Sequence, residues 1–180
     1  MHAPSAFSPL PDAPMRGGRR WYLRLAVVRL LLGVFPPFTL NRTRRLALQC
    51  CGIRLGNATV FWGLPILRGR GAIASRLQIG SDCGFNDGCI FDLAASLTIG
   101  NHVAVGHEVS FLTSLGPDGP AMAAPIIVGD GVWLGARCKI LAGVNVGAGA
   151  VIGAGVVVAA DVPPNTLMSG AKPVSLAKWL

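Results

Sequence analysis

The sequence has few charged residues and no long apolar run, although it is rich in apolar side chains. Only 13% of its 180 residues are charged, whereas 52% are hydrophobic. Polar residues and glycines interrupt the apolar ones throughout, so no stretch reaches the roughly 20 consecutive apolar residues that a membrane-spanning helix needs. These features predict one domain that buries apolar side chains along its whole length.

The sequence also lacks the marks of exported proteins and of several common enzyme classes. Arg29 interrupts the apolar segment near the N-terminus and no small-residue cleavage site follows it, so we expect no export signal. Five cysteines, an odd number in a chain of this length, do not describe a disulfide scaffold, and we expect a cytoplasmic protein with reduced thiols. P-loop, G-x-S-x-G and C-x-x-C motifs are absent, which excludes the chemistries that depend on them.

Positive charge is concentrated in the first third of the chain. The formal net charge is +8. Nine arginines lie before residue 55: Arg16, Arg19, Arg20, Arg24, Arg29, Arg42, Arg44, Arg45 and Arg54. Such a cluster attracts nucleic acid, an anionic membrane surface or an anionic cofactor. Because no nucleic-acid-binding motif accompanies it, we expect no nucleic-acid partner.

Two helices are predicted after a disordered tail. Residues 1–19 are rich in Pro, Gly, Ala and Arg, a composition typical of disorder. Residues 20–35 are predicted to form a helix that ends before two prolines, and a second short helix is expected between the N-cap Asn41 and Gly52. We therefore predict a helical cap over residues 20–52. The alternative role of these helices is peripheral contact with an anionic membrane.

From Ile53 onward, large apolar residues recur every six positions. Six units run without a break from Val128 to Pro163: VGDGVW, LGARCK, ILAGVN, VGAGAV, IGAGVV and VAADVP. Related units begin at Ile79 and Ile99. The first position of each unit is apolar, the fifth is small or β-branched, and the second is usually Gly.

A six-residue period indicates a solenoid of short strands and tight corners. It fits neither an α-helix, around which such residues would drift, nor an ordinary alternating strand. Three strand-and-corner units close one coil of roughly 18 residues, and coils stack on one another. We expect the second-position glycines to supply the backbone geometry of the corners. Cys83, Cys89 and Cys138 occupy the fifth position, so they are predicted to be buried.

These hexads resemble those of the left-handed β-helix, or hexapeptide-repeat, acyltransferases. The similarity is greatest to the sugar O-acetyltransferase branch, which includes galactoside, maltose and exopolysaccharide acetyltransferases. Besides the hexads, it rests on their interruption after Phe111, their resumption at PIIVGDGVWLGA and the terminal DVPPNTLMSG. The resemblance implies an all-β solenoid, a left-handed parallel β-helix over residues 53–170, with the N-terminal helical segment before it and a C-terminal segment over 171–180.

The resemblance also implies a homotrimer in which acetyl-CoA, the acyl donor, lies in a cleft between neighbouring subunits. A histidine would remove the proton of a sugar hydroxyl, and backbone N–H groups would hold the tetrahedral oxyanion. No metal is implied. Ala136 and Ala154 match positions that contact the coenzyme, and Lys172 is a candidate for its phosphates. Asn86 and Asp92 match polar positions near the acceptor, although both residue types are also common in corners.

The histidine that acts as general base in the family is missing from its usual place, where Leu115 and Gly116 stand. His107, in VGHEV, is the candidate substitute base, oriented by Glu108 or Asp92; the alternative is that His107 is an exposed corner residue.

Three functions therefore remain open. The first is an acetyl-CoA-dependent O-acyltransferase acting on a sugar or polysaccharide precursor. The second is a catalytically degenerate relative that serves as a binding or scaffold subunit. The third is a metal enzyme similar to the γ-carbonic anhydrases, which needs three histidine ligands. Against the third, His102 and His107 occupy different hexad positions, and Leu112 stands where the next histidine would be.

Overall fold

The computed structural model describes residues 41–114 and 123–170, the backbone of 173–175 and five helical residues near the N-terminus (residues 23, 26–28 and 30). The expected tail over residues 1–19, most of the first predicted helix and Lys172 lie outside the described residues. None of the helices in the described part of the chain is both long and apolar enough to cross a membrane.

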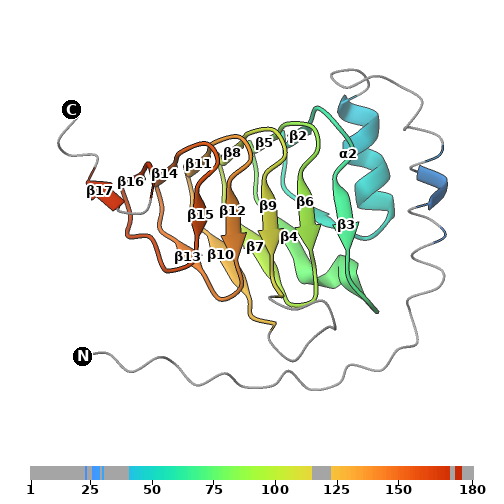
Figure 1. Cartoon of the computed structure of the whole chain (residues 1–180). Helices are drawn as coiled ribbons and strands as arrows, with labels where there is room; N and C mark the ends of the chain where they lie inside the picture. The colour runs from blue at the N-terminus through green and yellow to red at the C-terminus, as the bar shows by residue number, and fades with distance from the viewer. Residues whose placement is uncertain are drawn as a thin grey trace.

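The structure is a three-sided prism whose walls are three β-sheets (Figure 1). Sheet A contains β1 (Arg54–Leu55), β4 (Leu77–Ile79), β7 (Leu97–Ile99), β10 (Ile126–Val128) and β13 (Asn145–Val146). Sheet B contains β2 (Val60–Phe61), β5 (Gly84–Phe85), β8 (Ala104–Val105), β11 (Trp133–Leu134), β14 (Val151–Ile152), β16 (Thr166–Met168) and β17 (Pro173–Ser175). Sheet C contains β3 (Ile66–Arg68), β6 (Ile90–Asp92), β9 (Ser110–Leu112), β12 (Lys139–Leu141) and β15 (Val157–Val158).

The chain visits sheets A, B and C in turn, so each coil adds one short strand to every wall. Neighbouring strands in each sheet are parallel, except that β17 pairs antiparallel with β16. The repeat is interrupted between β9 and β10, where Ser114 and Ala123 form an antiparallel bridge, and β10 continues sheet A in register because Ile126 pairs with Leu97 of the preceding coil. The predicted fold, a left-handed parallel β-helix, is confirmed.

The hexad pattern predicts the core correctly. The residues at the first position are all buried: Ile79, Phe85, Ile99, Val105, Val128, Leu134, Ile140, Val146, Ile152 and Val158. So are those at the fifth, including the thiols of Cys83, Cys89 and Cys138. Phe61 stacks on Phe85 with ring centroids 4.8 Å apart, and Phe91 stacks on Phe111 at 5.2 Å. Columns of like residues thus run along the axis of the prism, as expected for stacked coils.

The reason for glycine at the second position differs from the one predicted. The left-handed backbone conformation lies instead at the fourth position, where Gly155 has φ +71° and even Arg137 has φ +60°. The second-position Gly135 does not lie in that region. A Cβ atom there would stand 2.6 Å from the backbone nitrogen of Ala154 in the next coil, so glycine is required by the close stacking of the coils.

Helix α2 (Asn41–Cys50) lies across the N-terminal end of the prism and contacts β1 and β2 (Figure 1). Its buried face includes Leu48, and Gly52, with φ +86°, follows its end, as predicted. The buried Arg44 donates a hydrogen bond from its guanidinium to the carbonyl oxygen of Trp62 at 3.0 Å, which attaches the helix to the first coil. The 3-10 helix η1 (Ile73–Arg76) completes that coil.

Candidate active site

Four of the residues singled out by the sequence share one edge of the prism. This edge, the B–C corner, comprises the turns that lead from sheet B to sheet C: residues 62–65, 86–89, 106–109, 135–138 and 153–156. Asn86, His107, Ala136 and Ala154 occur in successive turns of it. Since stacked strands are about 4.8 Å apart, His107 lies roughly 10 Å along the edge from Ala154.

Backbone hydrogen bonds hold the turns of the B–C corner in register. The amide of Arg137 donates to the carbonyl oxygen of His107 at 2.7 Å, and the amide of Gly155 donates to that of Ala136 at 2.8 Å. A Cβ atom at Gly106 would come within 2.6 Å of the nitrogen of Ala136. The edge is therefore rigid, and its third-position residues project outward at a fixed spacing.

The C-terminal part of the B–C corner is a shallow pocket in which four of the seven lining residues are glycine or alanine. Its lining is Gly153, Ala154, Gly155, Val156, Val157, Ser169 and Gly170. Ala154 and Gly155 are exposed. A narrow, flexible chain such as a pantetheine arm can lie against the backbone of Gly153, Ala154 and Gly155, where no side chain extends beyond Cβ.

Two cations that sequence reasoning missed lie beside this pocket. Lys139 is exposed at the start of β12 and is in register with Val157, one of the lining residues. Arg137 is exposed on the B–C corner next to Ala136. Both belong to the hexad LGARCK. It is the only hexad between Val128 and Pro163 with two cations, and this could have identified them as candidates from the sequence. Lys172, the cation proposed from the sequence, lies outside the described residues.

His107 is exposed on the B–C corner. Glu108 and Asp92, the two carboxylates expected to orient it, each accept a hydrogen bond from another residue. Glu108 accepts a hydrogen bond from Nε of Arg137 at 2.8 Å. The hydrogen bond and positive charge of Arg137 lower the pKa of Glu108, with a smaller contribution from His107. The structure thus places His107 near the charge of Glu108, whose principal partner is Arg137.

Asp92 lies away from His107, at the opposite end of a sheet C strand. Its Oδ2 accepts hydrogen bonds from Oγ and the amide of Ser114, at 2.5 and 3.1 Å, and its Oδ1 accepts one from the amide of Ala94 at 3.2 Å. Asp92 comes five residues after Asp87, the residue at the position of His107 in the neighbouring turn, or roughly 15 Å along an extended chain. Asp92 therefore cannot orient His107 within one chain; its hydrogen bonds hold Ser114, two residues after β9.

Asn86 is directed along the B–C corner toward the next coil. Its side-chain Nδ2 donates to the carbonyl oxygen of Val105 at 3.2 Å, while its side-chain oxygen is the acceptor that the residue retains for other contacts. Its backbone does not have the left-handed conformation that the corner interpretation assumed. Asn86 and Asp92 both belong to the coil adjacent to that of His107, but only Asn86 lies on the B–C corner, because Asp92 is at the far end of β6.

The described residues contain no group of three or more His, Cys, Asp and Glu side chains that could hold a metal ion. His102 lies in a turn from sheet A to sheet B, where its Nδ1 is 3.9 Å from a carboxylate oxygen of Asp82. His107 lies on the B–C corner, so the two histidines of the prism stand on different edges.

Comparison with known proteins identifies the repeats. A family model described as the hexapeptide repeat of succinyl-transferase matches residues 125–160. Nodulation protein L of Rhizobium meliloti is 32% identical over 138 residues, which cover 65% of this chain and 75% of the relative. A Schizosaccharomyces pombe protein named "Putative acetyltransferase" is 43% identical over 98 residues, and this chain spans 47% of its length.

Solved structures give the same result. The hexapeptide-repeat acetyltransferase VCA0836 from Vibrio cholerae, in complex with acetyl coenzyme A, is 27% identical with a TM-score of 0.66, covering 86% of this chain and 84% of that one. A maltose O-acetyltransferase from Clostridium difficile is 24% identical with a TM-score of 0.63, covering 81% and 79%, and shows the likeness of the fold.

Proposed function

Since this chain belongs to the hexapeptide-repeat acetyltransferase family, we propose that it transfers an acetyl group from acetyl-CoA to a hydroxyl of a sugar or polysaccharide precursor. The observation that carries the proposal is the B–C corner. It presents an imidazole, then two alanines, then a pocket of glycines along one rigid edge. The general base and the acyl donor would thus lie one after the other along the same edge.

The pocket fits the donor by shape and the neighbouring cations fit it by charge. The pantetheine arm would lie over Ala136 and Ala154, where the backbone is accessible. Lys139 and Arg137 would face the phosphates, to which both residue types bind well. A Vibrio cholerae relative that has been solved with acetyl coenzyme A supports this assignment.

In the proposed reaction, His107 acts as a general base. A ring nitrogen takes the proton of the acceptor hydroxyl as the oxygen attacks the thioester carbonyl carbon. The tetrahedral intermediate then expels the thiolate by breaking the C–S bond, and the proton passes from the imidazolium to the sulfur. Asn86, in the adjacent coil, would hold the acceptor through its side-chain oxygen. No covalent enzyme intermediate and no metal are required.

A homotrimer is part of the proposal, and the outer face of sheet B supports it. The residues on this face are all apolar or small: Val60, Gly84, Ala104, Trp133, Val151 and Leu167. Trp133 is 59% exposed in the single chain. An apolar sheet face of this kind is typical of a surface that packs against another subunit. We place the trimer in the cytoplasm, at the periphery of a membrane.

A binding or scaffold subunit without catalysis is the second candidate. The observation in its favour is that the two carboxylates considered as partners of His107 have other principal contacts, Arg137 for Glu108 and Ser114 for Asp92. In addition, Leu115 and Gly116 stand where the family has its usual catalytic histidine.

The experiment measures thiol release from acetyl-CoA with a panel of mono- and oligosaccharides, together with coenzyme A binding by calorimetry. His107→Ala is expected to lower turnover by about 10²–10⁴-fold and to leave coenzyme binding intact. His102→Ala is its matched control, an exposed imidazole in the equivalent turn of another edge, and should keep full turnover.

A second pair of variants tests the donor site. Ala154→Leu should abolish coenzyme A binding by filling the pocket, whereas Ala148→Leu, at the same hexad position on another edge, should not. If wild-type protein binds coenzyme A but transfers no acetyl group, and His107→Ala changes nothing, the scaffold role is the correct one. Absence of both binding and turnover would refute the acyltransferase.

A further inference from the structure

Charge is divided along the chain more sharply than the net value indicates. Residues 13–81 contain twelve of the thirteen arginines and no Asp or Glu. Seven of the eight acidic residues occur from Asp82 onward, against only four cations. Among the described residues, the seven arginines of residues 41–81 belong to α2 and the first coils, so this division along the sequence becomes a division along the axis of the prism. The N-terminal end is cationic and the remainder is slightly acidic.

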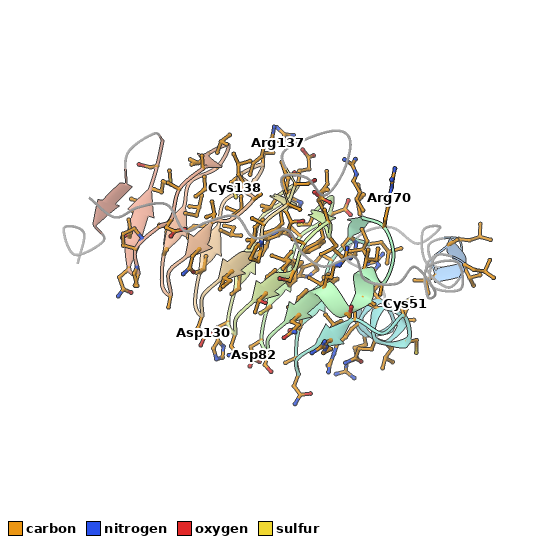
Figure 2. All side chains as sticks on the ribbon, turned by 90° about the horizontal axis from the view of Figure 1, so that it is seen from below. Cys51, Arg70, Asp82, Asp130, Arg137 and Cys138 are labelled. Atoms are coloured by element: carbon orange, nitrogen blue, oxygen red, sulfur yellow. The ribbon has the colours of Figure 1, made fainter. Side chains whose placement is uncertain are left out.

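The structure shows where the exposed arginines of this end are. Arg42 is on the exposed face of α2, Arg54 on the outer face of sheet A, and Arg68 on that of sheet C, each of the last two in the first strand of its sheet. Arg70 lies two residues after the end of β3 and points away from the body of the prism (Figure 2). We call these four residues the arginine end.

Exposed aliphatic side chains accompany these arginines. Leu46 of α2, one turn after Arg42, is 60% exposed. Among the helical residues nearer the N-terminus, Leu23, Val27 and Leu30 are 67%, 46% and 74% exposed. Their spacing of four and then three residues puts them on one face of a helix. A soluble polyanion gives such side chains nothing to contact, whereas the boundary between lipid headgroups and acyl chains does.

We propose that the arginine end is a docking surface for an anionic phospholipid membrane. The arginines contact the headgroups, and Leu23, Val27, Leu30 and Leu46 enter the boundary below them. The inference deepens the membrane contact proposed above, because it extends the surface from the helices to the first coil of the prism and fixes its orientation. It does not depend on acetyl transfer.

Docking by this end would leave the candidate active site accessible. The strands β1 and β13 are the first and the fifth of sheet A, so they are roughly 19 Å apart at 4.8 Å for each coil. The shallow pocket lined by Gly153, Gly155 and Gly170, here called the glycine pocket, lies beyond β14, at the far end from α2. The prism would stand on the membrane with its pocket at the opposite end, open to the solution.

The test is sedimentation of the full chain with vesicles of phosphatidylcholine, with and without phosphatidylglycerol, in the absence of acetyl-CoA. We expect binding only to the anionic vesicles, weakened by salt. Arg68→Gln/Arg70→Gln should reduce the partition coefficient roughly 30-fold, since each cation near the surface is worth about 1 kcal/mol. Its matched control, Arg137→Gln/Lys139→Gln, removes the same charge far from this end and should bind like the wild type.

A second variant separates a membrane from a soluble polyanion. Leu23→Gln/Leu30→Gln leaves the charge unchanged; it should lose vesicle binding on the order of tenfold and keep binding to heparin. Circular dichroism checks that each variant is folded. Equal losses for the two double-charge variants, binding to neutral vesicles, or full vesicle binding by the leucine variant would each overturn the proposal. Because acyl transfer is not measured, its absence would not alter these results.

Discussion

Replacing Gly135 by alanine tests why the coils of this protein need glycine at the second hexad position. Gly135 follows β11 and begins a turn of the B–C corner. In the structure a Cβ atom there would lie 2.6 Å from the nitrogen of Ala154 and 2.8 Å from the carbonyl oxygen of Ile152. The obstacle is the backbone of the next coil, which cannot rotate away as a side chain can.

The size of the effect follows from this geometry. Ordinary contact needs about 3.4 Å or more, so the two coils must separate by roughly 0.8 Å at this point. That separation lengthens the 2.7 Å hydrogen bond from the amide of Gly135 to the carbonyl oxygen of Ile152. Overpacking a dense interior costs 1–3 kcal/mol, and we expect about 3 here. For a chain of this length, about 3 kcal/mol lowers Tm by roughly 6–12 °C.

Gly155→Ala is the matched control, since it adds the same methyl group to a glycine two positions further along an equivalent turn. Its φ is +71°, and no atom lies within 4 Å of the added Cβ. Only the left-handed conformation is penalised, at about 1 kcal/mol, or roughly 2–4 °C in Tm. Thermal melts followed by circular dichroism compare the two variants. If Gly155→Ala proves the more damaging, corner conformation and not coil spacing is the function of the repeated glycines.

Two further predictions concern groups with shifted pKa values. Burial raises the pKa of Cys89 and of Cys138 to about 12. In native protein at pH 8, only the exposed Cys50 should therefore react rapidly with a thiol reagent, whereas all five cysteines should react after denaturation. A second fast-reacting thiol in the native protein would contradict the burial. Arg137 lowers the pKa of Glu108, so the pair contributes stability above the ordinary pKa of a glutamate and loses it as pH falls through the lowered value. Arg137→Gln should raise the pKa of Glu108 in an NMR titration, and an unchanged value would mean that the pair does not persist in solution.

The fold was predictable because it repeats. Each coil places the first and fifth hexad residues in the same buried environment. Val128 and Ile152, for example, both indicate a buried first position, so the prediction does not depend on any single residue. The sequence could not reveal why Gly135 is a glycine, because backbone conformation and contact between coils both select glycine. Only coordinates separate them, and they assign the left-handed conformation to the fourth position, where Arg137 adopts it without being glycine.

The candidate site was predictable in part. Ala136 and Ala154 belong to the repeat, and the structure places both on the B–C corner, with Ala154 in the glycine pocket. Asp92 instead binds Ser114 at the point where the repeat is interrupted, and this contact does not recur in the other described coils. The cations Arg137 and Lys139 were missed because they occur in a single unit and so contribute nothing to a period.

The two parts of the proposed reaction, donor binding and proton transfer, depend on the sequence in different ways. A donor site made of backbone needs only small residues at repeated positions, so several coils supply it together and a single substitution such as Ala136→Ser would leave most of it in place. Proton transfer needs one imidazole at one position, since His107 is the only histidine on the B–C corner among the described residues. Binding of the acyl donor should therefore tolerate single substitutions better than turnover does. Loss of one side chain would convert such a protein from an acyltransferase into a coenzyme-binding scaffold without disturbing its fold, which is why coenzyme binding and turnover must be measured separately.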